Sequence, residues 1–211
     1  MFRKAFLAPV VLAIVAVMAV PAGATWGWGG GGGGSKPGTI VDVLVAKSST
    51  DGFDQNPRDY DILIQAATTA DLVGALSDPS AQLTVFAPDD AAFVRTARTL
   101  GFTGSDEEGA WNFLVGAFTQ LGNGDPIPVL TTVLLYHVAP ERLGALQVVF
   151  SRQIDTLADV ADASFGVRLF QLIDNAPKLP NPYLNISALN QRASNGVIHG
   201  ITRVLIPLDI G

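Results

Sequence analysis

The sequence predicts an α+β fold in which helices precede strands along the chain. Apolar residues recur at helical spacing before about residue 140, whereas short alternating segments and turn residues dominate after it. Helices followed by strands are typical of α+β proteins, because α/β sheets alternate strand and helix. Hydrophobic residues make up 48% of the chain, which is enough for a packed core. We therefore expect one domain in which a β-sheet packs with several helices, the helices lying mainly in the N-terminal half.

Residues 1–24 have the features of a cleaved signal peptide. Arg3 and Lys4 give a positive start, an apolar run follows over residues 5–20, and Ala22-Gly23-Ala24 supplies small residues at the cleavage site. The apolar run is shorter than the roughly 20 residues that a membrane-spanning helix needs. Cleavage would leave an exported chain without a membrane span, and an uncleaved N-terminal anchor is the alternative.

Residues 25–38 predict a flexible tether ahead of a folded domain at 39–211. Trp26 and Trp28 precede an unbroken glycine run over residues 29–34. Glycine has no side chain to pack and has the greatest backbone freedom. The two tryptophans could form an adhesive tip, but in a low-complexity segment we expect them to have no specific partner.

The charge of the exported chain argues against nucleic acid and anionic lipid as partners. Of the 13 basic residues, Arg3 and Lys4 lie in the predicted leader, which leaves 11 against 19 acidic residues and a net charge of about −8. Such a surface repels phosphate, and no stripe of Lys and Arg offsets the repulsion. The chain has no cysteine, which excludes thiol catalysis and cysteine metal sites and, with the Ala-rich leader, indicates a bacterial exported protein.

Five helices are expected in the first half, around residues 41–45, 63–67, 72–76, 90–100 and 105–121. Asp89 or Asp90 can cap the fourth helix. Ser105 and Glu108 stand at capping-box spacing before the fifth. This fifth helix is the clearest amphipathic one, and its apolar stripe consists of Trp111, Leu114, Val115, Phe118 and Leu121.

Strands are expected at 82–87, 165–173, 184–188 and 197–201, and an apolar segment at 204–207 closes the domain. Pro88 ends the first strand, because proline cannot donate to a sheet ladder. Asn195-Gly196 predicts a tight turn with positive φ before the last strand. The apolar segment 129–138 is compatible with a helix or a strand.

Asp51, Asp54, Asp59 and Asp61 lie in or beside a polar loop and offer the oxygen ligands that calcium prefers. Their spacing does not match the EF-hand loop. We therefore interpret the loop as solvated and expect no metal site.

The sequence contains no recognisable catalytic machinery or cofactor motif. Its two histidines, His137 and His199, would need further ligands to close a metal site, so we interpret both as structural. No nucleophile elbow, zinc helix or phosphate loop is present. The acidic pairs Asp89-Asp90 and Glu107-Glu108 stand at predicted helix starts, where the helix dipole favours them. We expect no enzyme and no cofactor.

Three segments, in this order, resemble the fasciclin domain family. The segment 84–93, TVFAPDDAAF, resembles the family's first signature box. The segment 135–138, LYHV, resembles the central Tyr-His element, and 195–199, NGVIH, with 204–207, VLIP, resembles the terminal box. The positions that carry the resemblance are Thr84, Phe86, Ala87, Pro88, Phe93, Tyr136, His137, Asn195, Gly196 and His199.

The resemblance implies a twisted β-sheet wedge packed with several helices and a role in attachment outside the cell. The stretch from Phe93 to Tyr136 is longer than a minimal domain needs. Integrin-binding members carry an Asp-Ile pair shortly before the final box, whereas this chain has Asn190-Gln191, which argues against an integrin mechanism. Asn185-Ile186-Ser187 matches a glycosylation acceptor, which matters only in a host with that machinery.

Two main functions are compatible with these features, and a structural or signalling component of the envelope, with a defined protein partner, is a third. The first is a secreted adhesion module at the cell surface, in the matrix or in the periplasm, which binds a polysaccharide, a protein or a copy of itself. The alternative is an extracellular carrier of an apolar small molecule such as a carotenoid or lipid, as the resemblance permits. For the carrier, the candidate apolar groove is lined by Trp111, Leu114, Val115 and Phe118, although amphipathic stripes normally pack on the core.

Overall fold

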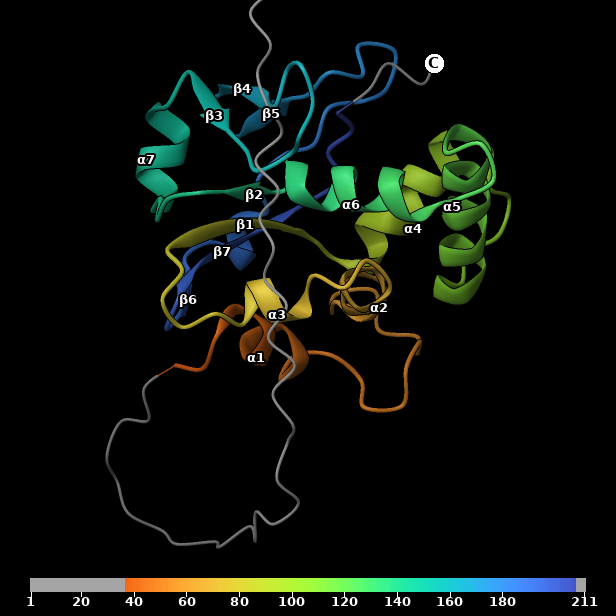
Figure 1. Cartoon of the computed structure of the whole chain (residues 1–211), viewed down its shortest axis with the longest axis horizontal. Coiled ribbons are helices and arrows are strands. Elements are labelled where there is room, and N and C mark those ends of the chain that lie inside the picture. Colours follow the sequence, from red (N-terminus) through yellow and green to blue (C-terminus); the bar gives the residue numbers. More distant parts are fainter. Residues whose placement is uncertain (1–36, 208–211) are drawn as a thin grey trace, which may run out of the picture. The chain divides into compact units, whose positions relative to one another are not determined.

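The computed structural model describes residues 37–207, so the predicted signal peptide and most of the predicted tether lie outside the described residues. A four-stranded sheet lies at the centre of the domain, with α1, α2 and α3 on one side and the smaller sheet with α7 on the other (Figure 1). Helices α4, α5 and α6 extend this arrangement at one end (Figure 1). The α+β class and the concentration of helices in the N-terminal half are confirmed.

The central sheet has the strand order β2-β1-β7-β6. Its two middle strands, β1 and β7, pair in parallel from Leu83↔Gly196 to Pro88↔Ile201, although they are far apart in sequence. The outer strands β2 and β6 are antiparallel to their neighbours. The bounds are β1 (Leu83–Pro88), β2 (Val138–Ala139), β6 (Gln191–Ala193) and β7 (Gly196–Ile201).

The second sheet is a three-stranded antiparallel meander accompanied by a short helix. Its order is β3-β4-β5. The segment expected as one strand over 165–173 is in fact a hairpin, because Leu169 adopts a positive φ of 58° and reverses the chain. The bounds are α7 (Ala145–Phe150), β3 (Gln153–Asp155), β4 (Ser164–Arg168) and β5 (Gln171–Ile173).

The alternation of side chains along β1 divides the interior into two cores. Val85 and Ala87 pack with the helices, whereas Phe86 points to the other face and packs with the small sheet. Phe86 meets Phe165 edge to face, with ring centroids 5.1 Å apart and an interplanar angle of 89°. Such aromatic contacts stabilise a core beyond their area burial. One strand thus joins the helical layer to the small sheet.

Six helices form the helical part, and the five predicted in the first half are all present. The ambiguous segment 129–138 is mainly helical, with prolines at its start, where the missing N–H costs nothing. The bounds are α1 (Ile40–Val45), α2 (Asp61–Thr69), α3 (Val73–Leu76), α4 (Asp90–Thr99), α5 (Glu107–Leu121) and α6 (Ile127–Tyr136). Within residues 37–207, no helix combines the length and the apolar character needed to cross a bilayer.

Two further local predictions are wrong. Asp106, one residue after Ser105, caps α5 by accepting the amide of Gly109 at 2.7 Å, so there is no capping box from Ser105. The segment 184–188 forms an isolated bridge and the 3₁₀ helix η1 (Ile186–Ala188) instead of a strand, because the Asn185 side chain accepts from the Ser187 amide and turns the chain.

The tight turn predicted at Asn195-Gly196 is present, but the positive φ predicted for it is wrong. Ser194 and Asn195 form the two-residue turn between β6 and β7, while Gly196 is the first residue of β7 and is not among the residues with positive φ. Glycine is required for space: a Cβ at this position would lie 2.5 Å from the carbonyl oxygen of Leu83 and 2.6 Å from Cδ1 of Ile40. The close approach of two parallel strands therefore explains the residue.

Candidate binding sites

The family-motif residues are buried and hold the two cores together. The Thr84 hydroxyl donates to the carbonyl of Glu141 at 2.6 Å and accepts the amide of Leu143 at 2.8 Å. These two bonds fix the segment before α7 to the central sheet. All ten motif positions are buried, namely Thr84, Phe86, Ala87, Pro88, Phe93, Tyr136, His137, Asn195, Gly196 and His199.

The Tyr136-His137 pair joins α6 to two distant segments. The Tyr136 hydroxyl donates to the carbonyl of Ser164 at 2.7 Å, and burial raises the pKa of this phenol. The His137 ring contacts the carbonyl of Val133 through Nδ1 at 2.7 Å and the amide of Leu205 through Nε2 at 2.9 Å. Burial lowers the pKa of His137 to about 4, so the ring is neutral. Both side chains satisfy backbone groups, as expected of structural residues.

Side chains of the terminal box also bond to backbone groups of distant segments. Asn195 is fully buried; its Oδ1 accepts the amide of Ile40, and its Nδ2 donates to the carbonyls of Leu76 and Asp78. His199 contacts the carbonyl of Leu143 at 2.9 Å, and burial lowers its pKa. Because the side chains of the motif residues are buried and bond within the domain, an external partner has to contact other residues.

The stripe on α5 packs into the helical core. Trp111, Leu114 and Phe118 are buried, and Val115 is half-buried. The space beside the stripe measures about 20 Å³, which is room for about one water molecule. The candidate groove predicted there is therefore filled by the protein's own side chains.

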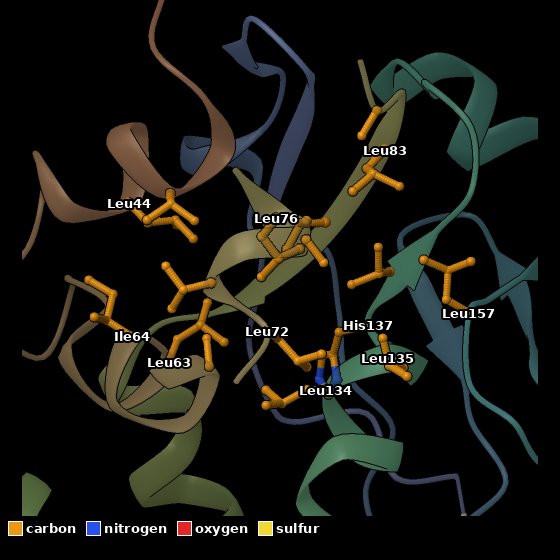
Figure 2. A pocket seen from close by; sticks show the side chains of 17 residues that line it. Leu44, Leu63, Ile64, Leu72, Leu76, Leu83, Leu134, Leu135, His137 and Leu157 are labelled. Carbon is orange, nitrogen blue, oxygen red and sulfur yellow. The ribbon is translucent and has the colours of Figure 1, made fainter. Parts of the chain in front are cut away.

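A larger apolar cavity lies on the other side of α2, between α1, α2, α3, β1 and α6 (Figure 2). Its volume is about 180 Å³. Every side chain that lines it is aliphatic except His137, whose two ring nitrogens bond to backbone groups. Ala75 and Leu157 are exposed and lie at its rim. A cavity without free hydrogen-bonding groups excludes polar ligands and accepts apolar ones.

Sequence reasoning missed this cavity because its walls come from five separate elements. Leu72, Val73 and Leu76 on and before α3 carried only a short helical signal. Their partners across the cavity, including Leu134 and Leu157, lie more than fifty residues further along the chain. The local sequence does not show whether apolar side chains from different elements fill the space between them or leave a cavity.

Exposed apolar side chains gather on the small sheet and α7. Leu146 and Phe150, four residues apart on α7, are 73% and 82% exposed, and Leu169 at the tip of the β4–β5 hairpin is 70% exposed. Phe170, Ile173 and Tyr183 of the same region are also exposed. We call the set Leu146, Phe150, Leu169 and Phe170 the α7–hairpin surface. Large exposed apolar side chains that recur in one region are typical of interaction surfaces.

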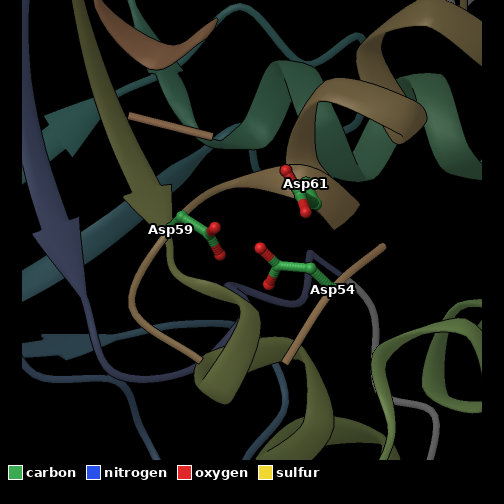
Figure 3. A group of neighbouring side chains, drawn as sticks. All are labelled: Asp54, Asp59 and Asp61. Atoms are coloured by element: carbon green, nitrogen blue, oxygen red, sulfur yellow. The ribbon is translucent and has the colours of Figure 1, made fainter. Parts of the chain in front are cut away.

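Five carboxylates converge where the loop before α2 meets the starts of three helices. The side chains of Asp54, Asp59 and Asp61 point toward one another (Figure 3), and one oxygen from each lies within 4.8 Å of the others. The same holds for Asp59, Asp90 and Glu107. Burial raises the pKa of Asp90 to about 9 and that of Glu107 to about 7. The expectation of a solvated loop is wrong at Asp59 and Asp61, because the loop folds onto the helix starts.

Comparisons with a family model, a relative and a solved structure are consistent with one another. The family model of the fasciclin domain matches residues 58–207. Protein sll1483 of Synechocystis sp. is 31% identical over 148 residues, which are 70% of this chain and 67% of that protein. Among solved structures, a FAS1 domain pair from the insect cell adhesion molecule Fasciclin I is similar with a TM-score of 0.53 and 14% identity.

That structural match covers 82% of this chain and 52% of the domain pair, so the chain spans about half the length of that structure, and the likeness shows the fold. The family match covers more than half of the 211 residues and includes the buried motif positions described above. The bacterial relative is consistent with the bacterial origin expected from the leader. The chain therefore belongs to the fasciclin domain family, which is associated with cell adhesion and binding.

Proposed function

We propose that the protein is a secreted, non-enzymatic adhesion module that attaches to a polysaccharide or protein of the cell surface or matrix through its α7–hairpin surface. The observation that carries this proposal is the exposure of Leu146 and Phe150, 73% and 82%, on a helix whose other face is buried at Val148. A few side chains that become buried at the centre of an interface supply most of the energy of protein contacts. The domain gains nothing for its own stability from leaving these two side chains in water.

The net charge of the chain and its family are both consistent with an adhesion module. A net charge of about −8 after removal of the predicted leader disfavours nucleic acid and anionic membranes, so apolar and hydrogen-bonding contacts remain as the means of attachment. Fasciclin domains are typically extracellular, which suits attachment outside the cell. Because the motif side chains are buried, the attachment surface lies outside the signature boxes.

The test is binding of the purified protein to envelope and matrix fractions of the producing organism over a concentration series. Saturable retention that is lost in the double variant Leu146→Ser/Phe150→Ser supports the proposal. Val45→Ser/Leu121→Ser, which removes exposed apolar side chains elsewhere, is the matched control and should bind as the wild type does. Retention that stays linear, or that both double variants keep, contradicts attachment through this surface.

A second function, transport of an apolar small molecule, is favoured by the 180 Å³ cavity between α1, α2, α3, β1 and α6. Apolar cavities of about 150 Å³ bind molecules of the size of benzene. The cavity would thus hold one ring or the end of a longer chain, with the rest of the ligand leaving past Ala75 and Leu157. Solvent extraction of protein purified from its native source, followed by mass spectrometry, tests this function: a stoichiometric apolar compound supports it, and a colourless, lipid-free protein contradicts it.

A further inference from the structure

The five carboxylates are held in place by the backbone around them. Asp61 accepts the amide of Ser49 at 2.9 Å through Oδ1, and Glu107 accepts the amide of Asp54 at 3.0 Å through Oε2. Both oxygens of Asp90 accept amides, those of Asp61 and Ile62. These bonds orient the carboxylates before any ligand arrives, and they leave further oxygens free to meet one.

Two of the free oxygens are buried without a partner. Oδ2 of Asp61 and Oδ1 of Asp59 lack any hydrogen bond, and the two residues are only 6% and 2% exposed. The side chains of both residues point toward that of Asp54 (Figure 3). A buried carboxylate oxygen without a partner costs about 1–3 kcal/mol or more, so each unpartnered oxygen indicates a missing cation or proton.

Two arginines near the cluster serve other groups. Arg98 lines the same hollow as Asp54 and Glu107, but its Nε donates to the carbonyl of Gly104 at 2.8 Å. Arg95 pairs with Asp89 at 3.8 Å, and Asp89 is outside the cluster. Asn56 donates to Asp59 at 3.2 Å but contributes no charge. Besides protons, which the raised pKa values of Asp90 and Glu107 favour, a bound ion can balance the converging charge of the loop and helix starts.

We propose that these carboxylates form a divalent-cation site, with calcium as the preferred ion and Asp54, Asp59 and Asp61 as the first ligands. Calcium takes carboxylate oxygens at about 2.3–2.6 Å, so opposite ligands lie about 4.6–5.2 Å apart. The oxygens of Asp54, Asp59 and Asp61 lie within 4.8 Å of one another, which is compatible with such a shell. Magnesium needs a tighter octahedron at about 2.0–2.1 Å and keeps several waters.

Asp90 and Glu107 each have an oxygen within 4.8 Å of one of Asp59, and they accept the backbone amides of Asp61 and Asp54 respectively, so both lie beside the proposed ligands. They are the first residues of α4 and α5, and Asp61 is the first residue of α2. An ion here would connect the loop before α2 to the starts of three helices. The spacing of Asp54, Asp59 and Asp61 differs from that of the EF-hand loop, and Asp90 and Glu107 belong to other elements, which is why the linear pattern of aspartates carried no calcium signature.

The experiment is isothermal titration of the whole purified protein with CaCl2, and separately with MgCl2, after removal of metal with EDTA and dialysis. We expect one calcium per chain, weaker magnesium binding, and a thermal midpoint that rises with calcium. Asp61→Asn and Asp59→Asn should each lower the calcium affinity at least tenfold. Asp51→Asn, an exposed aspartate of the same loop, is the matched control and should bind as the wild type does.

The variants also distinguish a metal site from carboxylates that share protons. If the site binds calcium, Asp59→Asn melts in EDTA no lower than the wild type, since one uncompensated charge is gone, yet it no longer responds to calcium. Should both buried variants fail to fold, Asp54→Asn, whose side chain is exposed, replaces them and must still lose affinity. No saturable heat and no thermal shift at millimolar calcium, or equal affinity in the wild type and these variants, overturns the proposal.

Discussion

The imidazole Nε2 of His137 accepts a hydrogen bond from the backbone amide of Leu205 at 2.9 Å, and this bond fastens the C-terminal segment to α6. Because Nε2 is the acceptor, the ring proton is on Nδ1, which donates to the carbonyl of Val133 at 2.7 Å. A second proton on Nε2 would break the bond to Leu205 and place a charge in the core. The family's central His is thus a neutral bridge between two backbone groups.

This bridge predicts a loss of stability in acid. Burial lowers the pKa of His137 in the folded state to about 4, whereas the unfolded ring titrates near its ordinary value of 6.5. Between these values the unfolded state binds a proton that the folded state lacks, so the contribution of His137 is complete above pH 6.5 and is lost as the pH falls toward 4. The largest possible loss is about 3 kcal/mol.

A variant is needed to isolate this contribution, because other groups act in the opposite direction. Burial raises the pKa of Asp174 to about 6, so acid relieves the strain of that carboxylate. We expect His137→Gln to be less stable than the wild type at pH 7.5 and the difference to shrink by about 2–3 kcal/mol at pH 4.5. Urea unfolding at the two pH values measures it, and a difference that is the same at both would contradict the neutral bridge.

Asn195→Asp should destabilise the domain strongly although the two side chains have nearly the same shape. The amide Nδ2 donates to the carbonyls of Leu76 and Asp78, each at 2.9 Å, and a carboxylate would face both with oxygen. Two unpaired carbonyls and a buried charge together cost about 3–5 kcal/mol. The exposed substitution Asn112→Asp is the control and should change the free energy of unfolding by less than about 0.5 kcal/mol. Comparable losses in the two variants would mean that the Asn195 bonds do not stabilise the fold.

Gly196→Ala tests whether space, not backbone conformation, explains the glycine. The added methyl group would lie 2.5 Å from the Leu83 carbonyl oxygen, so β1 and β7 must separate, at a cost of about 1–3 kcal/mol. Gly116→Ala on α5 meets nothing within 4 Å and should stabilise the protein by up to about 1 kcal/mol through helix propensity. Thermal unfolding of both variants measures the contrast. A neutral Gly196→Ala would show that the strand pair can relax around a side chain.

Elements with a clear local pattern were predictable from the sequence, whereas α7, whose largest apolar residues face outward, was not. The stripe from Trp111 to Phe118 predicts α5 because its apolar side faces the core. By contrast, α7 has Leu146 and Phe150 in solvent and buries only Ala145 and Val148, so its pattern does not follow the rule of an apolar inner face. Its largest apolar residues face solvent, so the helix shows no periodic apolar inner face in the sequence.

The candidate sites were predicted less well than the fold because they depend on distant contacts. We interpreted the segment of Asp59 and Asp61 as a solvated loop, because the local sequence does not show that Asp90 and Glu107 lie beside it in the fold. The signature boxes were visible because each is a continuous segment. Their side chains are buried and connect the two cores, so the strongest sequence signal marks the architecture and not a binding surface.

Filling the cavity between α1, α2, α3, β1 and α6 should stabilise the protein and exclude apolar ligands at the same time. Ala67 lines this space from α2 and is buried, so Ala67→Leu places three more carbons in the cavity. At about 0.8 kcal/mol for each buried methylene, and less where the fit is imperfect, the gain is about 1–2 kcal/mol. Urea unfolding measures this gain, and fluorescence titration with the neutral probe N-phenyl-1-naphthylamine measures access to the cavity.

We expect the probe to bind the wild type saturably and Ala67→Leu at least tenfold more weakly. Ala117→Leu adds the same carbons at a half-buried position of α5 outside the cavity, and it should leave probe binding unchanged. Binding that both variants keep would place the probe on the exposed apolar residues around α7 instead. A destabilised Ala67→Leu with wild-type binding would show that the cavity cannot take a larger side chain, and it would remove the main argument for a carrier. The two measurements together therefore separate a cavity built for a ligand from a packing gap that a leucine can close.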